Sequence, residues 1–150
     1  SIAKQLINKE HVFYLGRGID FYLSLEGSLK LKEISYIHSE AFQAGELKHG
    51  SISLIDEEFG VIAVVTDKTI SDKTISNLKE VSSRGAKIVA ITSIEDDNFS
   101  DYKIKIKDYG EVLTPLSVIV PMQLLAYNVA KLKDCDIDKP RNLAKSVTVE

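Results

Sequence analysis

The stretch Val61-Ile62-Ala63-Val64-Val65-Thr66 decides the fold of this chain. It is a nearly unbroken β-branched run, and Lys87-Ile88-Val89-Ala90-Ile91-Thr92 repeats the pattern. A strand that alternates apolar and polar residues buries only one face, whereas a continuous apolar run is typical of a strand buried on both faces. The two stretches therefore predict neighbouring strands inside a parallel sheet that is covered on both sides.

Weaker strand and helix patterns alternate around these two runs. His11–Leu15 is a short apolar run that ends at Gly16-Arg17-Gly18, and Tyr102–Lys107 alternates lysine with apolar residues as an edge strand does. Helices are expected over residues 20 to about 38, 71–84 and 115–133, the last with a kink or restart at Pro121. The alternation predicts an α/β fold, a three-layer αβα sandwich of flavodoxin type with a mainly parallel sheet and an irregular C-terminal tail.

The composition is that of an ordinary globular protein, and the net charge argues against two classes of binding partner. The 150 residues are 44% hydrophobic and 27% charged with a net charge of −3, so neither nucleic acid nor an anionic membrane is expected as a partner. No apolar run approaches the roughly 20 residues that span a bilayer. The single Cys135 excludes an intrachain disulfide and a Cys-rich metal site. These features favour a cytoplasmic protein.

The beginning of the chain predicts a piece of a longer protein. It has neither an initiator methionine nor an apolar signal core, and residues 2–10 resemble the end of a helix already under way.

A charged stripe marks the first predicted helix. Glu26, Lys30 and Glu33 have helical spacing and fall in one row. One interpretation is a solvated face with an ion pair. The other is a catalytic stripe, because the charges lie between two apolar arcs and opposite a face of serines, where they would be partly desolvated. The arcs consist of Leu23, Leu31 and Ile34 on one side and Phe21, Leu25 and Leu29 on the other, and the serines are Ser24, Ser28 and Ser35.

The histidines differ in their predicted positions. His11 begins a strand and His38 is expected to end a helix, so both are interpreted as structural. His49 lies beside Gly50 in a segment expected to be a short helical turn broken by glycines. A loop histidine is often incidental, but its titration range suits acid–base chemistry.

The loops that follow the predicted strands give little support for phosphate or dinucleotide binding. The loop over residues 66–72 has hydroxyl groups but no glycine, and it contains Asp67 and Asp72, which would repel phosphate. Ser71 at a helix N-terminus leaves an anion possible there. Gly16-Arg17-Gly18 is too short for a dinucleotide fingerprint and is interpreted as a strand-exit turn.

Three blocks resemble a known family. They are Glu26–His38, Gly45–Gly50 and the tail Asp138–Glu150, and they resemble the isomerase half of the glutamine:fructose-6-phosphate amidotransferases, the glucosamine-6-phosphate synthases. The resemblance covers essentially the whole chain and is loose over residues 67–112. It implies that residues 1–133 form the second of two sugar isomerase (SIS) domains, and that residues 134–150 form a tail over the sugar site.

The resemblance also implies roles for the stripe and for His49. Glu33 would move a proton between C1 and C2 of the sugar, with help from Lys30 at the adjacent oxygen. Glu26 would orient the ring-opening histidine. His49 would be that histidine, and in the family it reaches the active site of the neighbouring subunit, which implies a homodimer.

In the tail, Lys145 would form an imine with the ketone of fructose 6-phosphate, and Ala144 would contact the substrate. By itself, a lysine near a chain end is usually only a solvated charge. This chemistry needs no metal or organic cofactor. The implied partners are fructose 6-phosphate or glucosamine 6-phosphate, together with the first SIS domain and the glutaminase domain of the same parent chain. Two alternatives are a sugar-phosphate-binding regulatory module and a non-catalytic dimerisation domain.

Overall fold

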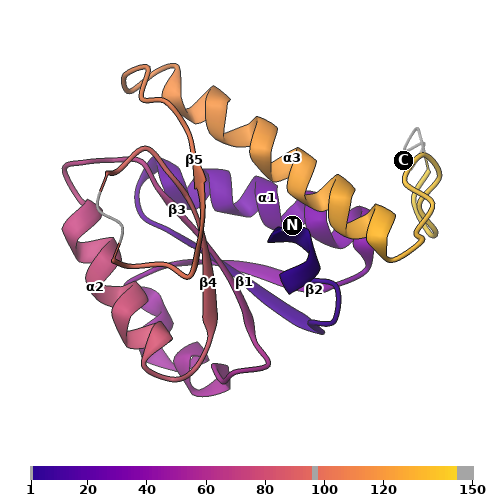
Figure 1. The fold of residues 1–150 in the computed structure, drawn as a ribbon, viewed down its shortest axis with the longest axis horizontal. Helices are drawn as coiled ribbons and strands as arrows, with labels where there is room; N and C mark the ends of the chain where they lie inside the picture. Colours follow the sequence, from indigo (N-terminus) through magenta and orange to yellow (C-terminus); the bar gives the residue numbers. More distant parts are fainter. Residues whose placement is uncertain (1, 96–97, 145–150) are drawn as a thin grey trace, which may run out of the picture.

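The computed structural model describes residues 2–95 and 98–144, and it is a three-layer sandwich (Figure 1). The central sheet has five parallel strands in the order β2-β1-β3-β4-β5. The strands are β1 (His11–Gly16), β2 (His38–Gln43), β3 (Gly60–Val65), β4 (Lys87–Thr92) and β5 (Tyr102–Lys105). The helices are η1 (Ile2–Gln5), α1 (Ile19–Ser35), η2 (Glu46–His49), η3 (Ser51–Leu54), α2 (Ser71–Ser82) and α3 (Thr114–Leu132). The predicted fold class is confirmed.

Two hydrophobic cores lie on opposite faces of the sheet. One joins the sheet to η1, α1 and α3, and the other joins it to α2 and the segment around η2. Every residue of β3 is buried, and β4 is buried after its first residue, as their apolar runs predict. β5 lies at the sheet edge with a half-exposed pattern, which confirms the alternating-lysine interpretation.

The segment after α1 was predicted wrongly. We expected a helix to about His38 and then a helical turn, but α1 ends at Ser35 and residues His38–Gln43 form the edge strand β2. Tyr36 ends the helix because it adopts a left-handed conformation, with φ of 61°. His38 therefore begins a strand rather than ending a helix. Of the helical turn expected over residues 40–50, only the short η2 is present.

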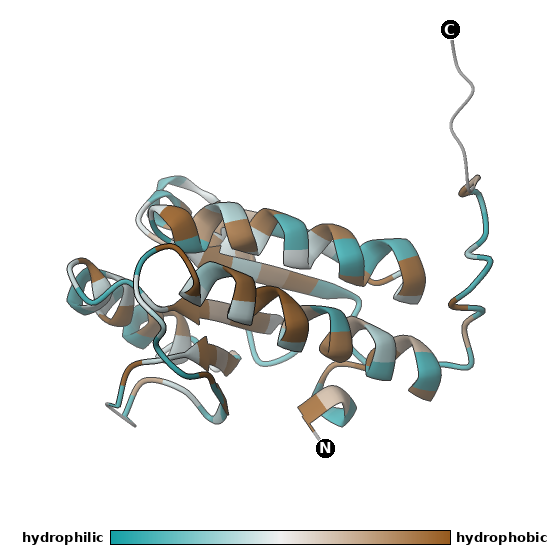
Figure 2. Cartoon of the chain, turned by 90° about the horizontal axis from the view of Figure 1, so that it is seen from above, coloured by the Kyte–Doolittle hydropathy of each residue, from teal (hydrophilic) through white to brown (hydrophobic). Residues whose placement is uncertain are grey.

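The helix α3 also differs from expectation. It runs without interruption past Pro121, so no restart occurs there. Among the described residues it is the one helix long and apolar enough to cross a bilayer by length and composition, which corrects the expectation that no segment approaches that length. Val118, Met122 and Val129 are buried in the core, so one side of α3 is part of a packed layer (Figure 2). At the other end of the chain, η1 is a short 3-10 helix.

Candidate active site

The charged stripe lies on the side of α1 that faces away from the sheet. The Lys30 Nζ atom is 2.8 Å from Glu33 Oε2 and 3.8 Å from Glu26 Oε1. The three side chains keep 33%, 29% and 41% of their surface exposed, in the order Lys30, Glu33 and Glu26. The hydrogen bond to Glu33 is the main reason that the pKa of Lys30 is raised, so Lys30 remains a cation. The stripe is thus a preformed, half-buried set of two carboxylates about one ammonium.

The serine face of α1 is buried, which explains why the stripe points outward. Ser28 and Ser39 hydrogen-bond to each other, and Ser39 Oγ also donates to the Ser28 carbonyl at 2.8 Å. Gly27 lies against Tyr14 and Met122, where a Cβ atom would come within 2.7 Å and 2.8 Å of their side chains. Small residues therefore let α1 approach the sheet and α3 closely, and the charges occupy the opposite side.

Only one of the two apolar arcs beside the stripe is covered by this chain. Leu23 and Leu31 belong to the core, whereas Leu25 and Leu29 are exposed. The neighbouring helix α3 also leaves apolar side chains exposed to solvent. They are Leu116, Val120, Leu124 and Tyr127. The stripe therefore adjoins an apolar face that this chain leaves open to solvent.

The tail begins beside the C-terminal end of α1. The Arg141 backbone N–H donates to Tyr36 Oη at 2.9 Å, and the Arg141 guanidinium lies 4.1 Å from the centre of the Tyr36 ring. Tyr36 follows Glu33 by three residues, so the tail reaches the end of the molecule that carries Glu33. Residues 134–144 contain neither helix nor strand, and Ala144 is exposed. Lys145 lies outside the described residues.

His49 lies at the other end of the sheet. The Ala44 backbone N–H donates to the Gly16 carbonyl at 2.9 Å, which fixes the segment before η2 at the carboxyl end of β1. His49 ends η2 with 75% of its side chain exposed. α1 starts at that edge and runs back, so about 20 Å of helix separates Glu33 from the start of α1. The chain therefore brings Glu26, Lys30 and Glu33 together, starts the tail at Tyr36 just beyond them, and places His49 at the carboxyl ends of the strands.

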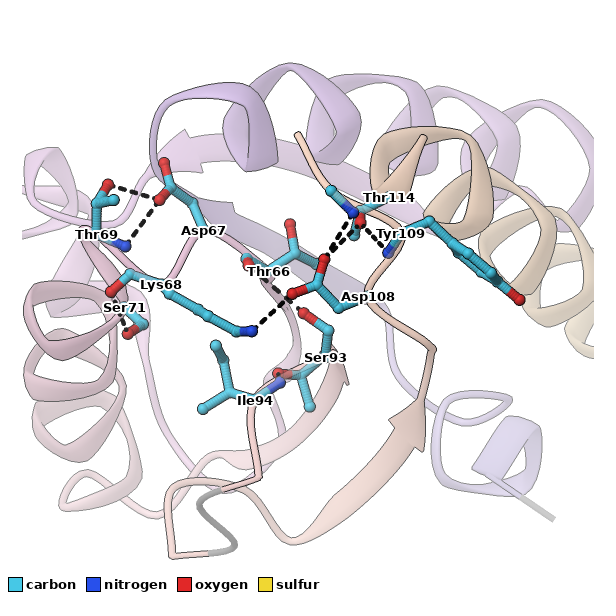
Figure 3. A network of polar contacts seen from close by, with 12 residues as sticks. Thr66, Asp67, Lys68, Thr69, Ser71, Ser93, Ile94, Asp108, Tyr109 and Thr114 are labelled. Carbon is cyan, nitrogen blue, oxygen red and sulfur yellow. Dashed lines mark hydrogen bonds and ion pairs between the residues drawn. The ribbon is translucent and has the colours of Figure 1, made fainter. Parts of the chain in front are cut away.

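A separate pocket of about 610 Å³ opens at the carboxyl end of β3, between the loop that follows this strand and the segment that leads into α3. Figure 3 shows the polar contacts around it. The Lys68 Nζ atom is 2.6 Å from Asp108 Oδ2, and Asp108 also accepts hydrogen bonds from Thr114 Oγ1 and the Gly110 N–H. The hydrogen bond from Lys68 is the main reason that the pKa of Asp108 falls to about 2. Lys68 is already paired with Asp108, and Asp67 also lines the pocket. The charge of the pocket is therefore unfavourable for phosphate.

The buried Asp20 holds the start of the loop that follows β3, and the sequence analysis did not identify it. It is 3% exposed and accepts hydrogen bonds from the Thr66 N–H, the Thr66 hydroxyl and the Asp67 N–H. Burial raises its pKa, although these hydrogen bonds act in the opposite direction. Tyr36, the anchor of the tail, was also missed. In the sequence, neither residue differs from an ordinary helix-start aspartate or a surface tyrosine.

Comparison with known proteins identifies the fold family. The family model described as SIS domain matches residues 5–132. The glutamine--fructose-6-phosphate aminotransferase (isomerizing) of Caldanaerobacter subterraneus subsp. tengcongensis is 52% identical over 99% of this chain, and that of Thermococcus kodakarensis is 48% identical over 99%. This chain spans 25% of the length of each. A solved structure of the C-terminal domain of glucosamine-fructose-6-phosphate aminotransferase from Francisella tularensis is similar with a TM-score of 0.87 and 41% identity, covering 92% of this chain and 40% of that one.

Proposed function

The chain belongs to the SIS domain family. We propose that it is the second SIS unit of a glutamine--fructose-6-phosphate aminotransferase. The parent enzyme would convert fructose 6-phosphate and glutamine to glucosamine 6-phosphate and glutamate. The observation that carries the proposal is the identity of about one half with aminotransferases of that name over nearly the whole chain. A cytoplasmic location, suggested by the lone Cys135, is part of the proposal.

Glu33 is the proposed base for the proton shift between C1 and C2. Its Oε2 atom is held 2.8 Å from Lys30 Nζ, so the carboxylate is oriented before a sugar arrives. It would take a proton from C1 and return it to C2, while Lys30 assists at the adjacent oxygen. A base must lie within hydrogen-bond reach of the proton it removes, and the outward-facing stripe leaves that space open.

Lys145 is the proposed partner of the sugar ketone, with Ala144 as a neighbouring substrate contact. Its neutral amine would attack C2, and loss of water would give an imine that makes the C1 proton more acidic. The hydrogen bond between Arg141 and Tyr36 supports this assignment, because it starts the tail next to the end of α1. The tail would then cover the stripe from the side of Tyr36.

His49 is the proposed ring-opening group, and it would act on the partner subunit's sugar. The position of His49 at the carboxyl ends of the strands supports this, because Glu33 lies about 20 Å along α1 from that edge of the sheet. Glu26 would orient the incoming histidine of the neighbouring subunit. In a symmetric dimer each chain would give one histidine and receive one.

The exposed apolar face beside the stripe is the proposed contact with the first SIS domain of the parent. A contiguous exposed apolar surface is typical of interaction sites in soluble proteins. The lengths of the relatives leave room for such a partner, because this chain spans a quarter of each.

The test is the Glu33→Gln variant of the full-length enzyme. Synthesis of glucosamine 6-phosphate is expected to fall by at least about a hundredfold, as for loss of a general base, while glutamine hydrolysis continues. Glu57→Gln, at an exposed position distant from α1 in the sequence, is the matched control and is expected to leave synthesis unchanged. Normal synthesis by the Glu33→Gln enzyme would refute the assignment.

A further inference from the structure

Two histidines outside the proposed active site face each other on the edge strand β2 and its neighbour β1. His11 and His38 are the first residues of β1 and β2 and are direct partners in the parallel pairing. Their Nδ1 atoms are 3.1 Å apart, and their rings meet edge-on at 80°. Both side chains are exposed. The backbone register thus holds two imidazole nitrogens within reach of one small ligand.

Each ring is supported by a further contact. The His11 ring stacks on Phe59 with 16° between the planes. The Nε2 atom of His38 lies 3.8 Å from Glu40 Oε1. In metal sites, a ligating histidine commonly turns its second nitrogen to a carboxylate, which fixes the ring and makes the ligating nitrogen more basic. The distance from Glu40 to His38 is longer than a hydrogen bond, so Glu40 would take that role after a small side-chain movement.

The spacing of the two nitrogens suits a divalent transition metal. Two nitrogens bound at about 2.0–2.1 Å to tetrahedral Zn²⁺ are about 3.3 Å apart, and cis nitrogens on a square-planar ion are about 2.9 Å apart. The observed 3.1 Å lies between these values. We propose that His11 and His38 form a two-histidine site for a divalent transition-metal ion such as Zn²⁺, with Glu40 supporting the His38 ring.

The proton balance of binding is simple. As neutral rings, the pair shares one Nδ1–H hydrogen, donated by one ring to the other. Binding moves that hydrogen from Nδ1 to Nε2 of the same ring, so both Nδ1 lone pairs become available and no net proton is released. With the ring centroids 5.2 Å apart, the two Nδ1 atoms point at each other. One ring must therefore turn before both Nδ1 lone pairs can point at the same ion. His38 has room for this turn, because 57% of its side chain is exposed.

The remaining coordination positions fall to water. Over residues 2–95 and 98–144, no group of three or more His, Cys, Asp or Glu side chains is placed to hold a metal ion. The protein would therefore supply two nitrogen ligands, and water would fill the other coordination positions. Imidazole ligands favour Zn²⁺, Ni²⁺ or Cu²⁺, whereas Mg²⁺ and Ca²⁺ prefer oxygen ligands.

The experiment is a Zn²⁺ titration of the 150-residue chain, followed by calorimetry and by long-range proton–nitrogen spectra of the imidazoles. One equivalent is expected to bind and to shift the Nδ1 resonances of both His11 and His38. The sequence has three histidines, so His49 is the internal control and its resonances are expected to stay in place. A shift at only one of the pair, or at neither, would overturn the proposal.

Variants give an independent readout. His11→Gln or His38→Gln is expected to weaken Zn²⁺ binding by more than about tenfold, and Glu40→Gln by about tenfold as an outer-shell change. His49→Gln is the matched control and is expected to bind Zn²⁺ like the unmodified chain. If the His11→Gln and His38→Gln chains bind Zn²⁺ as tightly as the unmodified chain, the ion lies elsewhere, for example at Cys135, and the proposed site is refuted. The spectra of the unmodified chain decide the question even if a variant fails to fold.

Discussion

Replacing Tyr36 with phenylalanine removes one hydrogen bond from the start of the tail and leaves the ring in place. The Arg141 N–H loses its acceptor at 2.9 Å, while the guanidinium can still lie over the ring. A single hydrogen bond of this kind contributes about 1 kcal/mol, so opening of the tail at Arg141 should become about fivefold more frequent. Tyr36→Leu also removes the cation–π contact, worth about 0.5–1 kcal/mol at an exposed site, and should bring the total to roughly tenfold to thirtyfold.

Amide hydrogen exchange measures this opening residue by residue. The exchange rate of the Arg141 amide is expected to rise by these factors in the two variants. The Lys139 amide is the internal control, because it donates to Asp136 Oδ1 within the tail and does not depend on Tyr36. Unchanged exchange at Arg141 would refute the anchoring role. An equal increase at Lys139 would show that the variants loosen the whole tail rather than this contact.

Two further predictions concern stability. Gly27→Ala should lower the free energy of unfolding by about 1–2 kcal/mol in urea denaturation, because the crowding of the new Cβ against Tyr14 and Met122 outweighs the gain in helix propensity; an unchanged or higher stability would contradict the close approach of α1. Asp108, with its pKa lowered to about 2, contributes stability that is present above its unfolded pKa near 3.8 and lost as the pH falls from about 4 to 2. The melting temperature of Asp108→Asn should therefore approach that of the unmodified chain over this interval, and a constant difference would contradict the Lys68–Asp108 pairing.

The central strands were predictable because burial on both faces leaves a local mark in the sequence. β3 and β4 are continuous apolar runs, and their predicted ranges agree with the structure to within one residue. β2 has no such mark, since His38–Gln43 contains no β-branched residue. It is a strand because it pairs with β1 and because Ser39 packs against Ser28, and both contacts are formed between segments distant in sequence.

The candidate site was predictable in part for the same reason. The spacing of Glu26, Lys30 and Glu33 shows that they share one side of a helix, and the structure places them together. The side of the helix that faces the sheet was harder to predict, because serines and Gly27 form the buried contact in place of large apolar residues. The route of the tail could not be predicted from the pattern, since the contact between Arg141 and Tyr36 joins residues 105 positions apart.

The measurement that tests the central claim most directly is trapping of the imine. The chain, alone and together with the first SIS domain of the parent, is incubated with fructose 6-phosphate and borohydride, and any reduced adduct is located by mass spectrometry. The proposal predicts one sugar phosphate on Lys145 when the first SIS domain is present. No adduct in either mixture, or an adduct on a different lysine, would contradict the assignment of this chain as the isomerase unit.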